Sequence, residues 1–182
     1  LVGAWLLVIA VFSVLLPGSF FTWQNFAVMF ASQAPAALLA LALIVPLTCG
    51  DYDLSGGATV TLAAVILGVM NVVHQQPIGL ALCVALGAGI VVGALNAFFI
   101  VYVRIPSLVV TLGTASVVTG FVQWLSDSST ISGLDGRFVD WIIIRQLFGI
   151  SYAFSVAVLV AAGLRYLLEY TARGRRMLVG GK

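Results

Sequence analysis

The stretch IGLALCVALGAGIVVGALNAFFIVYV, at residues 78–103, decides the fold of this chain. It contains no Asp, Glu, Lys or Arg, and it is longer than the roughly 20 apolar residues that cross a bilayer as a helix. Inside a bilayer the backbone must satisfy its own N–H and C=O groups, which a helix does within one segment. The stretch therefore predicts a membrane-spanning α-helix.

The remainder of the chain has the same apolar character. Hydrophobic residues make up 62% of the sequence, charged residues make up 8%, and the mean hydropathy is +1.19. A soluble domain carries about 25% charged residues, so lipid must surround much of this surface. We expect an all-α fold, a polytopic transmembrane helical bundle with about six spans. Apolar runs between polar breaks place the spans at 1–16, 26–48, 58–73, 78–103, 107–125 and 151–168.

Basic residues near the ends of the spans predict the orientation. Cytoplasmic loops carry an excess of Lys and Arg, and the end of the chain holds Arg173, Arg175, Arg176 and Lys182. We therefore expect a cytoplasmic C-terminal tail, with Arg104 on the same side and the 126–150 loop outside. Within that loop, residues 138–148 mix aromatic, aliphatic and charged side chains, which predicts a helix lying at the membrane interface.

Small residues recur every four positions within 78–103, at Ala81, Ala85, Gly89, Gly93 and Ala97. On a helix such residues let a neighbouring backbone approach closely. We expect helix packing at Ala85, Gly89 and Gly93, either within one subunit or between two subunits. Cys49 and Cys83 stand in apolar surroundings, which favours buried packing residues over a disulfide or a metal pair.

The segment GDYDLSGG, at residues 50–57, carries two acidic residues between two expected spans. Ionisable groups at membrane depth are costly and face a cavity or a partner. Asp53 also fits the N-cap position of the next span, where its side chain would accept a backbone N–H. Three interpretations of Asp51 and Asp53 therefore stay open: a helix cap, direct contact with a solute, and a structural role beside a pore.

The span at 107–125 is rich in hydroxyl groups for an apolar helix. Ser107, Thr111 and Thr114 fall on one face by the i, i+3, i+4 rule. Their hydroxyls either bond to the backbone four residues earlier or line a wet path for a polar solute. Asn96 sits on an apolar helix, which favours an interhelical hydrogen bond over contact with a ligand.

Several classes of protein are excluded by what the sequence lacks. It has no Gly-x-x-x-x-Gly-Lys-Ser/Thr loop for nucleotide binding, no Gly-x-Ser-x-Gly elbow and no His-Glu-x-x-His zinc site. We therefore expect neither an enzyme nor a metal protein, and no cofactor. A formal net charge of +2 without a basic patch argues against nucleic acid as a partner.

Five segments, in order, resemble the ribose-type branch of bacterial ABC importer permeases. The first two are Asn25-Phe26 with Gln33, and GDYDLSGG at 50–57, which resembles that family's Gly-Gly-Ile-Asp-Leu-Ser-Val-Gly. GALNA at 93–97 resembles its Gly-x-x-Asn-Gly, and RIPSLVVTLGT at 104–114 resembles its Ile-Pro-x-Phe-Ile-x-Thr-Leu-Gly-Thr. The fifth, TARGRR at 171–176, resembles the segment ahead of the family's ATPase-coupling loop. The departures from the family's pattern bear on which solute is transported; they are Asp51, Tyr52, Gly56 and Ala97.

The resemblance implies a transmembrane permease subunit of an ATP-driven ABC importer, for a sugar or a similar small polar solute. The implied partners are separate ATP-binding cassette ATPase subunits, a periplasmic solute-binding protein, and a second permease copy or a paralogue. The implied location is the lipid bilayer of the bacterial inner membrane. We expect residues 1–182 to form one transmembrane permease domain, truncated at both ends. The expected substrate pathway includes Asp51, Asp53, Ser55, Asn96, Thr111 and Thr114.

An ion-coupled secondary transporter is the alternative from another class. It would need acidic or basic residues buried in its spans as relay groups. Arg165 is the one charged residue inside an expected span, and it stands near the cytoplasmic end. The residues therefore favour the importer.

Overall fold

The computed structural model describes residues 2–140, 146–147, 150–172 and 174–175. Its main helices are α1 (Val2–Leu15), α2 (Trp23–Thr48), α3 (Gly56–Gly68), α4 (Ile78–Ala97), α5 (Ser107–Leu125) and α7 (Tyr152–Tyr170). The shorter elements are the π-helical turns η1 (Val69–Val73) and η2 (Phe98–Tyr102), the one-turn helix α6 (Gly136–Val139), and the two-residue strands β1 (Gln146–Leu147) and β2 (Ile150–Ser151).

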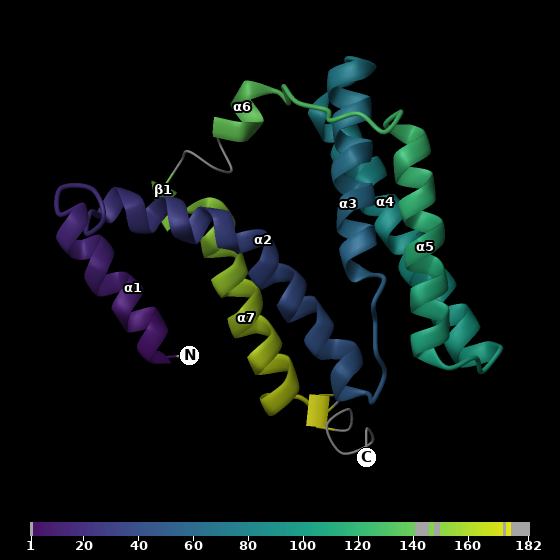
Figure 1. Cartoon of the computed structure of the whole chain (residues 1–182). Helices are drawn as coiled ribbons and strands as arrows, with labels where there is room; N and C mark the ends of the chain where they lie inside the picture. The colour runs from purple at the N-terminus through teal and green to yellow at the C-terminus, as the bar shows by residue number, and fades with distance from the viewer. Residues whose placement is uncertain (1, 141–145, 148–149, 173, 176–182) are drawn as a thin grey trace.

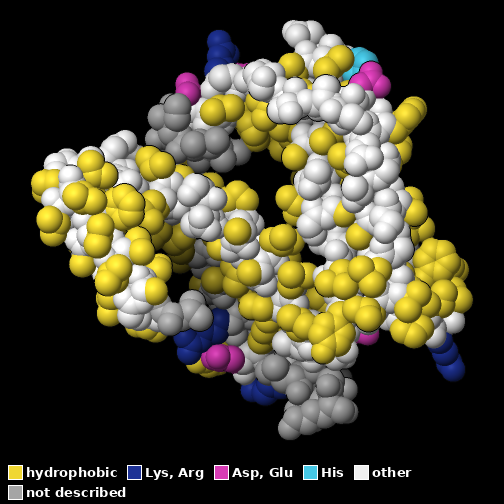
Figure 2. Space-filling model, in the orientation of Figure 1, with side chains coloured by type: hydrophobic (Ala, Val, Ile, Leu, Met, Phe, Trp, Pro, Cys, Tyr) yellow, Lys and Arg dark blue, Asp and Glu magenta, His cyan; other side chains and the backbone are white. Residues whose placement is uncertain are grey.

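Five of the described helices are long and apolar enough to cross a membrane: α2, α3 with η1, α4 with η2, α5, and α7. The helix α1 has 14 residues, so it is about 21 Å long, which is shorter than a hydrocarbon core of about 30 Å. Figure 2 shows hydrophobic side chains along the helices and charged side chains gathered toward the two ends of the molecule. The predicted all-α, polytopic membrane bundle is confirmed.

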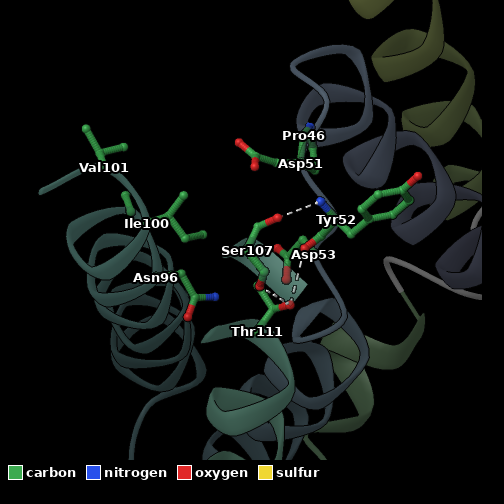
Figure 3. A pocket seen from close by; sticks show the side chains of 10 residues that line it. Pro46, Asp51, Tyr52, Asp53, Asn96, Ile100, Val101, Ser107 and Thr111 are labelled. Carbon is green, nitrogen blue, oxygen red and sulfur yellow. Dashed lines mark hydrogen bonds between the residues drawn. The ribbon is translucent and has the colours of Figure 1, made fainter. Parts of the chain in front are cut away.

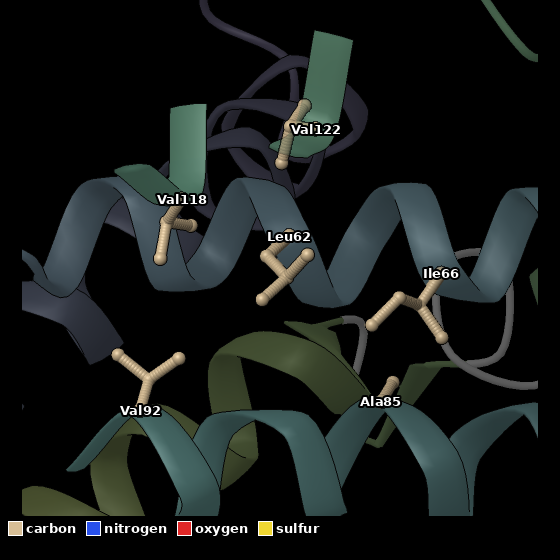
Figure 4. Packing of buried hydrophobic residues seen from close by; sticks show 6 residues of the cluster. All are labelled: Leu62, Ile66, Ala85, Val92, Val118 and Val122. Atoms are coloured by element: carbon tan, nitrogen blue, oxygen red, sulfur yellow. The ribbon is translucent and has the colours of Figure 1, made fainter. Parts of the chain in front are cut away.

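The helices form two packed groups (Figure 1). In the first group α3 packs against both α4 and α5, and in the second α2 packs against α7. The second group is joined by Phe30 and Phe154, whose ring centroids are 4.8 Å apart. The first group encloses an apolar cluster (Figure 4) of Leu62, Ile66, Ala85, Val92, Val118 and Val122.

A glycine ends α2 and turns the chain toward α3. Gly50 has φ of +82°, a left-handed conformation that costs glycine little. The Asp51 N–H donates to the Pro46 carbonyl at 3.1 Å, and the Gly50 N–H donates to the Leu47 carbonyl at 3.1 Å. These two bonds make a Schellman motif, which pairs the last carbonyls of the helix. Residues 51–55 then continue as non-helical chain.

The α3–α4 and α4–α5 connections share the same sequence of backbone features. Each starts with a π-helical turn and passes through one residue of positive φ, Gln75 at +55° or Arg104 at +61°. A proline, Pro77 or Pro106, directly precedes the next helix. Each proline is the N-cap residue, whose carbonyl accepts the first bonds of the helix. A proline also disfavours helical dihedrals in the residue before it, which keeps the helix from starting earlier. Both connections therefore return the chain to the bundle within a few residues.

The small-residue stripe of α4 leaves the packed face part-way along the helix. Ala85 is buried, and a Cβ on Gly89 would lie 3.8 Å from the nearest side chain of α3. Gly93 is exposed, with no atom within 4 Å of where a Cβ would stand. Because a helix has 3.6 residues per turn, a four-residue repeat rotates by about 40° at each step. The buried face instead continues through Val92 and Asn96.

Two expectations are wrong in the described residues. The predicted helix at 138–148 fails at Gln146–Leu147, which pairs as an antiparallel strand with Ile150–Ser151. The helix α6 ends at Val139, and residues 141–145 and 148 lie outside the described residues; helices this short are marginal on their own. Cys49 and Cys83 are exposed rather than buried, because their apolar neighbours belong to the outer surface of the bundle.

Candidate functional site

The non-helical segment 51–55 reaches inward from the end of the bundle. It leads from the end of α2 to the start of α3 (Figure 1). There it meets Asn96, six residues before the end of η2, and Thr114, seven residues after the start of α5. At 1.5 Å per residue these positions lie about 10 Å from the helix ends. Non-helical backbone at such a depth is tolerated only where protein buries it or where it lines a cavity.

A directed chain of hydrogen bonds anchors this segment to α4 and α5. The Thr114 hydroxyl donates to Asn96 Oδ1 at 2.7 Å, and Asn96 Nδ2 donates to Ser55 Oγ at 2.8 Å. The Ser55 hydroxyl donates to Asp53 Oδ1 at 2.6 Å, and the Ser55 N–H donates to the same oxygen at 2.9 Å. Every donor faces one acceptor, and the chain ends on a carboxylate, which strengthens its bonds.

A second set of bonds holds the backbone of Tyr52 against α5 (Figure 3). The Tyr52 N–H donates to Ser107 Oγ at 3.2 Å, and the Thr111 hydroxyl donates to the Tyr52 carbonyl at 3.2 Å. The same hydroxyl lies 2.9 Å from the Ser107 carbonyl, so its single proton is shared between the two oxygens. Side chains of α5 thus satisfy a backbone that belongs to neither a helix nor a sheet.

A pocket of about 230 Å³ lies between this segment, α4 and α5 (Figure 3). Asp51 and Asp53 are partly buried in its wall, and no Lys or Arg is among the described residues that line it. In the described part of the chain, the Asp51 carboxylate accepts no hydrogen bond and makes no ion pair. The lining residues are Pro46, Asp51, Tyr52, Asp53, Asn96, Ala97, Ile100, Val101, Ser107 and Thr111.

The structure brings the expected pathway residues together at this place. Asp53, Ser55, Asn96 and Thr114 share one hydrogen-bond chain, whereas Asp51 lines the pocket with Asp53, Asn96 and Thr111. Ser55 is 1% exposed and Asn96 is 6% exposed, so both amide and hydroxyl are buried.

Asp53 does not occupy the N-cap position that the sequence suggested. The helix α3 starts at Gly56, and Ser55 precedes it without a side-chain capping bond. The hydroxyl of Ser55 is already engaged by Asp53 and Asn96. The carboxylate of Asp53 therefore fixes the residue in front of the helix instead of the first turn itself.

The hydroxyls of α5 form hydrogen bonds in two ways, on different faces of the helix. Ser116 and Thr119 donate to the carbonyls four residues earlier, at 3.0 and 2.7 Å. Thr114 instead donates to α4, and Thr111 shares its one proton between its own helix and the 51–55 segment. The apolar wall of the pocket, Ile100 and Val101, carried no signal in the sequence, because such residues fill every span.

At the opposite end of the first group, a loop crosses α3. A Cβ on Gly68 would stand 3.0 Å from Ile131 Cγ2. The Asp135 N–H donates to Asn71 Oδ1 at 3.0 Å, and Asn71 Nδ2 donates to the Gln76 carbonyl at 3.0 Å. Asn71 thereby ties this loop to the α3–α4 connection.

Known proteins resemble the chain over most of its length. The autoinducer 2 import system permease protein LsrC of Enterobacter sp. (strain 638) is 33% identical over 135 residues, which cover 72% of this chain and 39% of that protein. The LsrC of Escherichia coli (strain SMS-3-5 / SECEC) is 28% identical over 160 residues, 87% of this chain and 46% of that protein. The LsrC of Salmonella typhimurium (strain LT2) is 30% identical over 178 residues, which cover 94% of this chain and 49% of that protein.

This chain therefore spans less than half the length of these curated relatives. No solved structure matches it. Residues 24–182 match the family described as the branched-chain amino acid transport system permease component, which confirms the resemblance to ABC importer permeases and a multi-pass membrane protein. The match covers all but the first 23 residues, and this chain belongs to that family of membrane permeases.

Proposed function

We propose that this chain is part of the pore-forming permease subunit of an ATP-driven importer, and that its solute is a sugar or a similar small polar molecule. The observation that carries the proposal is the acidic pocket beside the buried hydrogen-bond chain. Ionisable groups within a membrane protein mark solute pathways when they face a cavity. The membership of the permease family supports the same reading.

The chemistry of the pocket favours a neutral solute that carries hydroxyl groups. Carboxylates accept hydrogen bonds from hydroxyls, and the Asp51 carboxylate has no partner in the described part of the chain. An anion would meet Asp51 and Asp53 without a neutralising cation among the described lining residues. Ile100 and Val101 offer an apolar wall to the C–H face of such a solute. The volume of about 230 Å³ is below the roughly 300–1,000 Å³ of pockets for drug-sized ligands, which suits a small molecule.

The pathway in this proposal runs past Asp51, Asp53, Ser55, Asn96, Thr111 and Thr114. Asp51 and Asp53 face the solute, and the other four fix the segment that carries them. The relatives named as permeases of an autoinducer 2 import system support a solute-importing role.

The proposed partners are those of an ABC importer: ATP-binding cassette ATPase subunits, a periplasmic solute-binding protein, and a second permease copy or a paralogue. The proposed location is the bacterial inner membrane, with the C-terminal tail and Arg104 in the cytoplasm. The excess of basic residues in the tail supports this orientation.

Uptake by the complete transporter in proteoliposomes tests the proposal. The full-length permease, its ATPase and its binding protein would be reconstituted, and uptake of radiolabelled ribose, xylose and galactose measured with and without ATP inside. We expect uptake of at least one of these sugars only with ATP, and a lower uptake with Asp51→Asn. Ser116→Ala, whose hydroxyl bonds its own helix, is the matched control and should leave uptake unchanged. Uptake that needs an ion gradient and no ATP would instead establish a secondary transporter.

A further inference from the structure

We infer that Asn96 is a positioning residue: its amide holds the 51–55 segment at its depth in the membrane and thereby aims the Asp53 carboxylate at the pocket. Its consequence for transport rests on the proposed function, but the positioning itself does not. Asn96 joins three elements, because it accepts from Thr114 of α5, lies on α4, and donates to Ser55 ahead of α3.

The chemistry of this position needs an amide. Thr114 gives its proton to Asn96 Oδ1, so the residue at 96 must accept there. Ser55 gives its own proton to Asp53, so its oxygen can only accept, and the residue at 96 must donate. An amide does both at once, whereas a carboxylate only accepts and an aliphatic side chain does neither.

The position of Asn96 on α4 distinguishes its positioning role from the packing role of its neighbours on the same face. Ala85 and Val92 lie on the same face of α4 and belong to the apolar cluster. Asn96 lies one turn beyond Val92, at the end of that cluster, where it lines the pocket and is only 6% exposed. The Asn96 amide therefore lies at the boundary between the apolar cluster and the pocket.

The segment has a second attachment that does not depend on Asn96. Ser107 and Thr111 hold the backbone of Tyr52 through bonds of 3.2 Å, which are longer than the bonds of 2.6–2.8 Å in the Asn96 chain. Loss of the Asn96 amide should thus free one end of the segment and leave the helices in place. The expected change is local to residues 51–55.

Thiol labelling at two positions of the pocket tests this inference. Tyr52→Cys reports on the segment, and Val101→Cys reports on η2, which continues α4, at the same pocket. Both would be placed in the full-length permease in membranes, in a background with Cys49 and Cys83 replaced by serine. The measured quantity is the rate of modification by a small hydrophilic methanethiosulfonate reagent in permeabilised cells.

We expect Asn96→Leu to change the labelling rate at position 52 about fivefold, the population shift that one hydrogen bond typically gives, and to leave position 101 within about twofold. Asn96→Asp should act like Asn96→Leu, because it keeps the bond from Thr114 and loses the donor to Ser55. Thr114→Val should give a smaller change in the same direction, and Thr114→Ser should restore the original rate. Thr114 is only partly buried, so these two variants keep the test valid if changes at position 96 prevent folding.

Equal changes at both reporter positions would make Asn96 a general packing residue and overturn the inference. An unchanged rate at position 52 in all variants would overturn it as well. A changed rate at position 52 with unchanged sugar uptake would uphold the positioning role, and it would refute the proposal that this pocket conducts the solute. Ser116→Ala should move neither rate, because its hydroxyl bonds the Leu112 carbonyl of its own helix.

Discussion

Replacement of Asp53 separates the structural use of its carboxylate from the use of its charge. One oxygen of this side chain accepts both the Ser55 N–H, at 2.9 Å, and the Ser55 hydroxyl, at 2.6 Å. Alanine would leave both donors without that acceptor, and Ser55 is 1% exposed, so water could not easily replace it. Asparagine keeps a carbonyl oxygen that can accept both bonds, and it removes only the negative charge.

The magnitudes follow from these two bonds. A hydrogen bond to a charged group contributes about 1.5–3 kcal/mol, and a neutral one contributes about 0.5–1.5 kcal/mol. We therefore expect Asp53→Ala, which loses both bonds, to lower the free energy of unfolding by about 3–6 kcal/mol, and Asp53→Asn, which makes both bonds neutral, to lower it by about 2–3 kcal/mol. For a chain of 150–250 residues, 1 kcal/mol shifts the unfolding temperature by about 2–4 °C. The alanine variant should thus unfold at least about 6 °C lower than the unchanged protein, and the asparagine variant at least about 4 °C lower.

The assay combines thermal unfolding of the purified full-length permease in detergent with sugar uptake by the complete transporter. If the charge of Asp53 acts on the solute, Asp53→Asn should lose uptake while it stays folded and present in the membrane at normal amounts. If Asp53 only fixes Ser55, the asparagine variant should keep uptake and lose only the smaller amount of stability given above. An alanine variant with the unfolding temperature and the uptake of the unchanged protein would refute the reasoning altogether.

Three further predictions concern the rest of the bundle. In a cysteine-free background, an impermeant thiol reagent added to intact cells should label Ser128→Cys and not Ala172→Cys, both at exposed positions; the reverse pattern would overturn the proposed orientation. Gly89→Leu should lower the thermal stability of the permease, because α3 lies against this position. Gly93→Leu should be tolerated unless another part of the transporter packs there. Equal stability of both variants and the unchanged protein would contradict the close contact between α3 and α4. Gly68→Val should displace the loop that crosses α3 and speed its cleavage by an added protease; an unchanged rate would contradict the close contact.

The sequence predicts the helices well where polar residues or proline stand at both ends of an apolar run. The expected span at 107–125 coincides with α5, Ser107–Leu125, because Pro106 precedes it and Ser126, Asp127 and Ser128 follow it. The expected span at 78–103 ends one residue beyond η2 for the same reason. The π-helical turns could not be predicted, because their residues are as apolar as those of the helices that they extend.

The polar residues of the candidate site could be predicted, but its apolar wall and the arrangement of the residues could not. Asp53 and Asn96 attract attention in any apolar chain, since polar groups in a membrane need partners. The hydrogen bond between Asn96 and Ser55 requires α3 to start at Gly56, inside the bundle, rather than directly after the end of α2. The start of α3 is set by Gly50, which ends α2, and by the hydrogen bonds from the 51–55 segment to α5. The bonds to α5 are tertiary contacts, so the sequence alone does not predict them.

The apolar cluster limits where a solute in the pocket could go. Leu62, Val92 and Val118 belong to the cluster that fills the space between α3, α4 and α5. The pocket adjoins α4 and η2 between Asn96 and Val101, at the opposite end of α4 from Ala81. A route between α3, α4 and α5 would therefore have to pass through the cluster. A solute would therefore have to leave by the open side of the pocket, along the outer surface of this group. If the proposed pathway runs through this pocket, the group would supply one of its walls, and a further element, such as α2 or a second permease subunit, would have to supply the facing wall.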